Sequence, residues 1–189
     1  YIITQNQLRK DRLVDAGVQK EKVYVLGSAR YCDEWMAQNK RILPRVMKAE
    51  DKSYKNLKAV FMTTRFAFRI DVDRMLKTFD LLSKINDIEV MVTPHTRTGK
   101  EGEFYDALTL RNSADISSVE LCEWADVVLV IGTSVMTEAL MQGKPVLYLK
   151  YLHGNTMLFE ECGACLTIHD EAELVDAIES LRTRRMALP

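Results

Sequence analysis

The sequence predicts an α/β protein built on a doubly wound parallel sheet. Short runs rich in β-branched residues alternate with longer segments of helical periodicity, the pattern of strands joined by crossover helices. The most apolar run, Asp126 to Ile131 (DVVLVI), has the unbroken apolar character of a strand covered on both faces. Hydroxyl and cationic residues follow several of these runs, at the edge where such sheets bind ligands.

The composition is that of an ordinary globular protein. Of the 189 residues, 47% are hydrophobic and 28% charged, and 26 basic against 27 acidic residues give a net charge of −1. With this balance the chain has no net positive charge to attract a phosphate backbone, which argues against nucleic acid as a partner. No apolar run approaches the roughly 18–20 residues of a spanning helix, and no signal peptide is visible. The four scattered cysteines predict reduced thiols, so we expect a cytoplasmic protein.

Residues 1–45 are predicted to be the terminal βαβ piece of a preceding lobe and a connection. Strands are expected at Tyr1 to Thr4 and at Lys22 to Leu26. Helical spacing from Gln5 to Ala16 predicts a helix between them, which Gly17 ends as a C-terminal cap. Because the chain starts with Tyr rather than Met, we interpret it as an excerpt that lacks a partner lobe.

Residues 46–189 carry the more regular alternation and are predicted to form the main domain. Asp71, Ser117 and Asp170 are expected to begin helices as N-caps, the last two with capping-box spacing. The predicted strands are Leu57–Thr63, Ile88–Thr93, Ala107–Leu110, Asp126–Ile131, Pro145–Leu149 and Ala164–Ile168, and the predicted helices are Val72–Ile85, 117–124, Thr133–Gln142 and a closing helix with an apolar stripe at Leu174, Ala177, Ile178 and Leu181.

Ligands of an open parallel sheet bind beyond the carboxyl ends of its strands, so the candidate site residues are those that follow each strand. They are hydroxyls, cations and one carboxylate, a set that suits a phosphorylated ligand with a ribose diol. The candidates are Gly27, Ser28 and Arg30; Thr63, Thr64 and Arg65; His95 and Arg97; Thr133, Ser134 and Glu138; and the loop Tyr151 to Thr156.

The strongest motif is the step from the buried strand into Gly132-Thr133-Ser134 and a helix. A helix N-terminus favours phosphate, and both hydroxyls can donate to its oxygens. Glu138, one turn beyond Ser134, can accept hydrogen bonds from a ribose diol. The alternative is that Ser134 is only an N-cap and Glu138 only complements the helix dipole. Neither the dinucleotide glycine fingerprint nor a Walker lysine is present, which disfavours a nicotinamide enzyme and a P-loop NTPase.

A second motif, Val92 to Arg97, places a histidine and an arginine just past a strand. Arg97 can clamp a phosphate, while His95 can donate to a leaving phosphate or move a proton. A structural histidine and a solvated loop arginine are the alternative reading of the same residues. The motif alone leaves both readings open.

A third motif, Phe61 to Arg65, again ends a strand in hydroxyls and a guanidinium. Thr64 and Arg65 can contact the ligand from the opposite side of the crevice, or Thr64 can simply turn the chain. The basic segment 41–55 predicts a solvated helix face, with an anionic membrane surface as the alternative. Trp35 and Trp124 are expected in the core.

With these motifs in view, the chain resembles the C-terminal half of a GT-B nucleotide-sugar transferase. Closest in pattern are the CDP-glycerol glycerophosphotransferases and related capsule or teichoic-acid polymerising enzymes, over about residues 1–180. Lys22 to Arg30 (KVYVLGSAR) resembles the strand and Gly-x-Pro-Arg turn that end the N-terminal lobe, with Ala29 replacing proline. Met62 to Arg65 resembles the Pro-Thr-x-Arg turn, with Thr63 replacing proline.

Two further segments carry the resemblance. His95 stands where the family has a His-Pro motif, here with Thr96 replacing proline. Thr133-Ser134, the Glu138-Ala139-Leu140 run and Gly143-Lys144-Pro145 look like the paired-hydroxyl segment and the Glu-Ala-Leu and Gly-Lys-Pro runs of these enzymes. The order of all these motifs is more specific than any one of them.

The resemblance implies a Rossmann-like fold and a nucleotide-activated donor, CDP- or UDP-linked, used in surface-polysaccharide synthesis. It implies His95 as the catalytic residue and Glu138 as the ribose-binding residue, with no metal or cofactor. The general base would come from the other lobe, so the excerpt alone is expected to bind nucleotide without turning over donor and acceptor. The implied phosphate-binding residues are Thr133, Ser134, Arg97, Thr64 and Arg65, and the implied interlobe turn is Gly27, Ser28 and Arg30.

Two other functions stay open from the sequence. A non-hydrolysing UDP-sugar 2-epimerase would keep the fold and also use His95, Arg97, Ser134 and Glu138. A non-catalytic nucleotide-binding module would bind the ligand without any transfer. Whichever function applies, the basic segment 41–55 could bring the full-length protein into contact with the inner face of the cell membrane.

Overall fold

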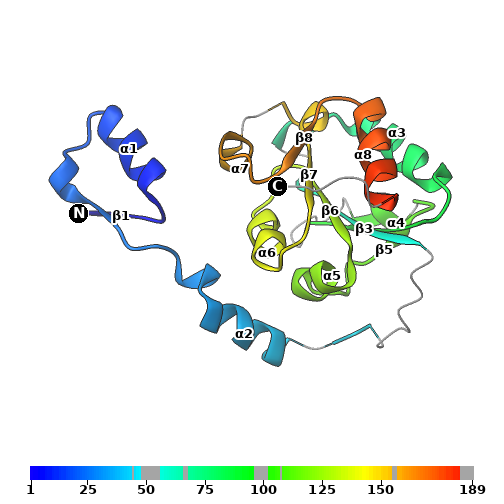
Figure 1. Ribbon diagram of the computed structural model, residues 1–189, viewed down its shortest axis with the longest axis horizontal. Coiled ribbons are helices and arrows are strands. Elements are labelled where there is room, and N and C mark those ends of the chain that lie inside the picture. Colours follow the sequence, from blue (N-terminus) through cyan, green and yellow to red (C-terminus); the bar gives the residue numbers. More distant parts are fainter. Residues whose placement is uncertain are drawn as a thin grey trace. The chain divides into compact units, whose positions relative to one another are not determined.

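The computed structural model divides the chain into two compact units, residues 1–42 and 43–189. It describes residues 1–43, 45–47, 56–65, 68–95, 102–106, 108–154 and 157–183 (Figure 1).

The first unit contains a two-stranded parallel sheet and two helices. Its elements are β1 (Ile2–Thr4), α1 (Gln7–Asp15), the 3-10 turn η1 (Lys20–Lys22), β2 (Val23–Val25), the 3-10 turn η2 (Ala29–Tyr31) and α2 (Asp33–Ile42). Both strands and the first helix were predicted, with the helix beginning after Asn6, whose side chain accepts from the Arg9 amide at 2.9 Å. Helix α2 was not predicted. Trp35 is 44% exposed on that helix, so its prediction as a core residue was wrong.

The second unit is a six-stranded parallel sheet with the strand order β5-β4-β3-β6-β7-β8. Its strands are β3 (Leu57–Met62), β4 (Ile88–Thr93), β5 (Arg111–Asn112), β6 (Val127–Val130), β7 (Val146–Leu149) and β8 (Leu166–Ile168). The predicted parallel α/β sheet is confirmed. The strand predicted at 107–110 was wrong, because the pairing with β4 begins only at Arg111.

The strand order places a topological switch point between β3 and β6. The chain adds β4 and β5 on one side of β3, then returns to add β6, β7 and β8 on the other. Crossover connections diverge at such a point and leave a crevice beyond the carboxyl ends of the two strands. By this rule, a ligand is expected at the edge where Thr63 and Ile131 begin the segments that follow β3 and β6.

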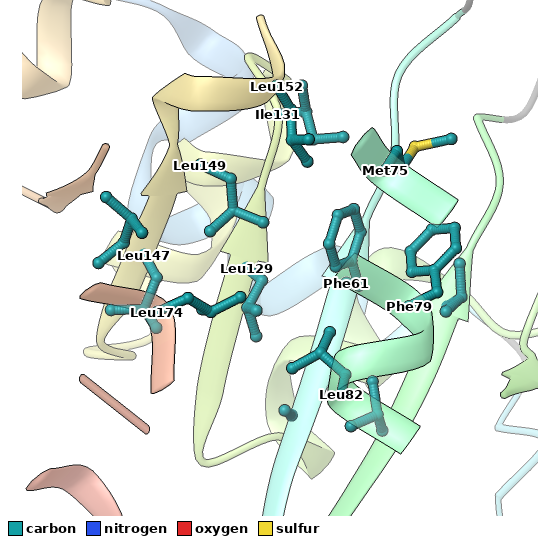
Figure 2. Packing of buried hydrophobic residues seen from close by; sticks show 14 of the residues in the cluster. Phe61, Met75, Phe79, Leu82, Leu129, Ile131, Leu147, Leu149, Leu152 and Leu174 are labelled. Carbon is teal, nitrogen blue, oxygen red and sulfur yellow. The ribbon is translucent and has the colours of Figure 1, made fainter. Parts of the chain in front are cut away.

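Helices cover both faces of this sheet, as alternation along the strands requires. They are α3 (Val72–Lys84), α4 (Gly102–Asp106), α5 (Ser118–Trp124), α6 (Val135–Met141), α7 (Leu158–Glu161) and α8 (Glu171–Arg182), with the 3-10 turn η5 (Lys150–Leu152). Phe61 belongs to the core cluster that includes residues of α3 and α8. Its ring meets that of Phe79 on α3 edge-on, with 4.9 Å between the ring centroids (Figure 2). Its neighbour Val60 packs with residues of α5 and α6 on the opposite face. Period-two alternation thus divides the core into two layers.

The predicted N-caps of the second unit are confirmed. The Asp71 side chain accepts from the Arg74 amide at 3.0 Å, Ser117 from Glu120 at 3.2 Å, and Asp170 from Glu173 at 2.9 Å. Each bond satisfies one of the amides that a helix leaves unpaired in its first turn. The helices α3, α5 and α8 therefore begin where local spacing predicts.

Glu120 departs from its predicted capping-box role. Instead of returning to Ser117, its carboxylate accepts from the backbone amides of Val46 (3.1 Å) and Met47 (2.8 Å). The side chain is buried, and bonds from backbone amides compensate for the loss of water around its charge. Glu120 therefore anchors the segment that leads into β3.

Lys144 stabilises the C-terminal end of α5. Its ammonium donates to the carbonyl oxygens of Glu123 (3.2 Å) and Ala125 (2.7 Å), which the helix leaves without amide partners. We expect Lys144→Met, which keeps the stem, to lower the free energy of unfolding by about 1–2 kcal/mol in urea denaturation. Lys84→Met removes an exposed partner of Asp80 and should cost less than about 0.5 kcal/mol. Equal costs for both variants would contradict this role.

Candidate functional site

The carboxyl ends of β4, β3 and β6 lie side by side. Met62, the last residue of β3, pairs with Thr93 on one side and with Val130 on the other. Because the three strands are parallel, the segments that leave them start next to one another. The structure therefore gathers the predicted site residues that follow these strands at one edge of the sheet, around the switch point.

The segment after β3 begins with two threonines, of which the first has a structural role and the second is a candidate ligand contact. The amide and the hydroxyl of Thr63 both donate to the carbonyl oxygen of Thr93, at 3.1 and 3.0 Å, so this residue extends the β-ladder. Thr64 is only 3% exposed, and within the described part of the chain its hydroxyl makes no hydrogen bond. A hydroxyl at this edge of the sheet that the described residues leave without a hydrogen bond makes Thr64 a candidate ligand contact. Arg65 is exposed.

The turn after β6 is built on a left-handed glycine. Gly132 has φ +62°, a conformation that side chains disfavour, and it brings Thr133 and Ser134 round to the start of α6. Thr133 is buried and Ser134 is exposed. The helix begins at Val135, two residues later than predicted, and Ser134 occupies the N-cap position without a side-chain capping bond. The alternative prediction for Ser134 is therefore correct in the N-cap position but wrong in the capping hydrogen bond, which the Ser134 side chain does not make.

The first turn of α6 leaves few amides for a ligand. The Val135 amide donates to the Thr133 hydroxyl at 3.4 Å, and the amides of Met136 and Thr137 donate to the Thr133 and Ser134 carbonyls at 3.3 and 3.2 Å. Among the described residues, the amides of Thr133 and Ser134 have no such partner. These two amides and the Ser134 hydroxyl are donors that the turn can offer to an anion. The donors available for a phosphate on this turn therefore belong to Thr133 and Ser134, the two residues before the helix.

Glu138 lies buried on α6 with its carboxylate against α5. Its Oε2 accepts from the Ser118 hydroxyl at 2.7 Å, a contact that the sequence did not indicate. Burial, aided by the Glu138 charge, raises the pKa of the nearby Cys122 thiol to about 12, so this thiol stays protonated at neutral pH. Ser134, one turn earlier, is exposed, whereas Glu138 is buried.

The second motif is only partly described by the structure. His95 is half-buried directly after Pro94, at the end of β4 and therefore beside the segment that holds Thr64. Arg97 lies outside the described residues. The structure thus brings His95 to the same edge as Thr133 and Ser134.

A histidine that the motifs did not single out also reaches the turn. A Cβ added to Gly132 would lie 3.3 Å from Cε1 and 3.4 Å from Nδ1 of His153, and 3.6 Å from Sδ of Met157. His153 follows η5, one short turn after β7. The sequence indicated the loop Tyr151 to Thr156 as a whole, because it follows a strand, but gave no reason to choose this residue within it.

Contacts with α3 and α8 hold the start of this loop. Tyr151 donates to or accepts from the Thr78 hydroxyl at 2.9 Å, and its ring lies 4.6 Å from the Arg74 guanidinium. Arg74 in turn binds both carboxylate oxygens of Glu171, at 2.7 and 2.8 Å. Burial raises the pKa of Tyr151 to about 12, so the phenol remains neutral. The loop is therefore fixed by a network of three elements.

The remaining predicted residues belong to other parts of the chain. Gly27 has φ +78° and is exposed, Ser28 is half-buried, and Arg30 is exposed with its guanidinium 5.5 Å from the Tyr31 ring. All lie in the first unit, and their role as an interlobe turn stays a prediction. In the basic segment, Arg45 pairs with Glu123 at 3.0 Å, while residues 44 and 48–55 lie outside the described residues.

Solved structures with the same architecture were found by comparison. The UDP-GlcNAc 2-epimerase of Methanocaldococcus jannaschii in complex with UDP-GlcNAc and UDP matches 95% of this chain and 53% of its own, with a TM-score of 0.68 and 17% identity. The S. aureus MnaA–UDP co-structure matches 95% of this chain and 50% of its own, with a TM-score of 0.65 and 15% identity. The spinosyn rhamnosyltransferase SpnG matches 74% of this chain and 41% of its own, with a TM-score of 0.50 and 12% identity.

These comparisons establish the fold. The chain has the Rossmann-like GT-B architecture of these structures, as the sequence predicted, and spans about half the length of the two UDP-bound structures. No protein-family model matches the sequence, and no curated protein matches it. Within the described ranges, no helix is long and apolar enough to cross a membrane, and no group of three or more His, Cys, Asp or Glu residues could hold a metal ion.

Proposed function

We propose that the second unit binds a UDP-linked sugar beyond the carboxyl ends of β3, β4 and β6. The observation that carries this proposal is the gathering of Thr64, His95 and Ser134 at the switch point of the sheet. The ligands of two structures with this fold, UDP-GlcNAc and UDP, support a uridine diphosphate over a cytidine diphosphate.

The diphosphate would lie on the turn after β6. The amides of Thr133 and Ser134 and the Ser134 hydroxyl would supply its donors, and the Thr64 hydroxyl would supply one from the segment after the neighbouring strand. His95 would donate from the end of β4, with Arg65 as a cation after β3. Arg97, two residues beyond His95 in the sequence, is proposed as a second cation. Fixed donors of this kind stabilise a diphosphate leaving group without a divalent metal.

The ribose role of Glu138 is part of the same proposal. The carboxylate would accept from the sugar diol while Ser118 holds its Oε2. A buried carboxylate that already has one protein donor is well oriented, since the bond fixes its rotamer. This arrangement makes Ser118 the residue that positions Glu138 for the diol.

We infer that the longer protein is an enzyme acting on UDP-sugars, with 2-epimerisation as the reaction favoured first. The UDP-GlcNAc 2-epimerase of Methanocaldococcus jannaschii matches 95% of this chain, whereas the rhamnosyltransferase matches 74%. Transfer in surface-polysaccharide synthesis is the second candidate, supported by the Thr133-Ser134 and Glu138-Ala139-Leu140 resemblance. Incubating UDP-GlcNAc with the longer protein and no acceptor separates the two, because an epimerase forms the C2 epimer and a transferase does not.

The binding site is tested by calorimetric titration with UDP, CDP and uridine. Ser134→Ala should weaken UDP binding about five- to tenfold, since one hydrogen bond to a charged phosphate is lost. Glu138→Gln, which keeps the shape of the side chain, should weaken UDP but not 2′,3′-dideoxy-UDP. Ser83→Ala, on the exposed side of α3, is the control and should bind as wild type. A wild type that binds no nucleotide, or a Ser134→Ala variant with unchanged affinity, would refute the site.

A further inference from the structure

The His153 imidazole covers the turn that the proposed function uses for phosphate. Its Nδ1–Cε1 edge lies against Gly132, within 3.3–3.4 Å of the position that a Cβ would take. Gly132 is followed directly by the two residues whose amides and hydroxyl are the donors of the turn. A diphosphate bound to those donors would therefore lie next to the glycine that the imidazole ring contacts.

The backbone around His153 fixes the ring in this place. The amides of His153 and Gly154 both donate to the Lys150 carbonyl, at 3.1 and 2.7 Å, which closes a tight turn. The Leu152 carbonyl accepts from the Asp71 amide at 3.0 Å, and the Leu152 side chain is 1% exposed in the same core layer as Ile131 (Figure 2). Anchored on both sides, the histidine is held over the turn before any ligand arrives.

We propose that His153 is a ligand-contact residue that donates to the diphosphate of the bound nucleotide sugar. This inference rests on the proposed function and adds a donor from the segment after β7 to those after β3, β4 and β6. Nδ1 is buried, and the ring edge that carries it faces Gly132. The contact makes His153 a determinant of selectivity for phosphorylated ligands over the bare nucleoside.

The chemistry of this position favours a hydrogen-bond donor over a purely apolar side chain. Packing against Gly132 needs only an apolar side chain, and Met157, whose Sδ lies 3.6 Å from the same Cβ position, is one. An imidazole beside Gly132 brings a hydrogen-bond donor to the turn that contains the amides of Thr133 and Ser134. Diphosphate is the part of a nucleotide sugar that such a combination recognises.

Titration of four variants with UDP and with uridine tests the proposal. His153→Leu keeps the packing and removes the donor, and should weaken UDP binding at least about tenfold while changing uridine binding less than about twofold. His153→Gln, which retains a donor, should lie closer to wild type for UDP. His153→Ala should resemble His153→Leu. His169→Leu, an exposed histidine after β8, is the control and should bind UDP as wild type.

The outcomes separate this proposal from the function on which it rests. UDP binding by wild type together with unchanged affinity in His153→Leu would overturn the role of His153 and leave the site intact. No UDP binding by wild type would overturn both. Side-chain ¹⁵N spectra of the wild-type protein give a readout that needs no folded variant, because UDP, but not uridine, should shift the His153 ring resonances. An unshifted ring on saturation with UDP would refute the contact.

Discussion

Replacing Phe61 by alanine is expected to lower the free energy of unfolding by about 3–5 kcal/mol. The side chain is fully buried on β3, at the centre of the sheet, and its ring packs edge-on against Phe79 of α3. The truncation removes buried apolar surface and leaves a cavity that strands on both sides prevent from collapsing. Urea denaturation followed by circular dichroism gives the value.

The control for this variant is an exposed residue of α3, the helix that carries Phe79. Leu76 is on α3 but 39% exposed, so Leu76→Ala should cost less than about 1 kcal/mol. A loss below about 1.5 kcal/mol in Phe61→Ala would mean that the layer between the sheet and α3 is not the tightly packed core described here.

Replacing Gly132 by alanine is expected to weaken UDP binding at least about tenfold and to destabilise the fold by about 1–3 kcal/mol. Two effects add at this position. A side chain at φ +62° is strained, and its Cβ would lie 3.3 Å from His153 Cε1, closer than ordinary contact allows. Relief of the crowding would displace the turn and with it the amides of Thr133 and Ser134.

Gly143 provides a matched control, because it has nearly the same φ (+66°) and nothing within 4 Å of an added Cβ. Gly143→Ala therefore measures the backbone strain alone, and the additional loss in Gly132→Ala measures the crowding. The double variant Gly132→Ala/His153→Ala should recover stability relative to Gly132→Ala. Equal destabilisation by the two glycine variants, with full UDP affinity in both, would show that the contact between turn and ring is unimportant.

Local signals in the sequence were sufficient for most helix and strand positions of the second unit. Asp71, Ser117 and Asp170 were found because an N-cap bonds an amide only three residues away, within one window of sequence. Strand β4 was predicted with its observed bounds, Ile88–Thr93, because its apolar run is interrupted only by Glu89. Strand β5 was misplaced, since two polar residues that pair only through their backbone carry no hydrophobic pattern.

Contacts between distant segments could not be read from the sequence. Glu120 has the spacing of a capping box, yet its carboxylate bonds amides 73 and 74 residues earlier in the chain. Likewise, motif spacing predicted the Gly132 turn but not the histidine from the segment after β7 that lies over it. Each depends on which segments the sheet order brings together, and that order has no local signature.

The place of β3 in the middle of the sheet has a consequence for synthesis on the ribosome. Translation delivers β3 and β4 first, whereas the partner for the other edge of β3 is β6, at Val127–Val130. Until those residues emerge, a nascent chain exposes an apolar strand edge that includes Val60 and Phe61, the kind of edge that pairs with other chains. The interval between translation of residues 93 and 130 is therefore the stage at which co-translational aggregation is most favoured, and at which a chaperone that covers strand edges would act.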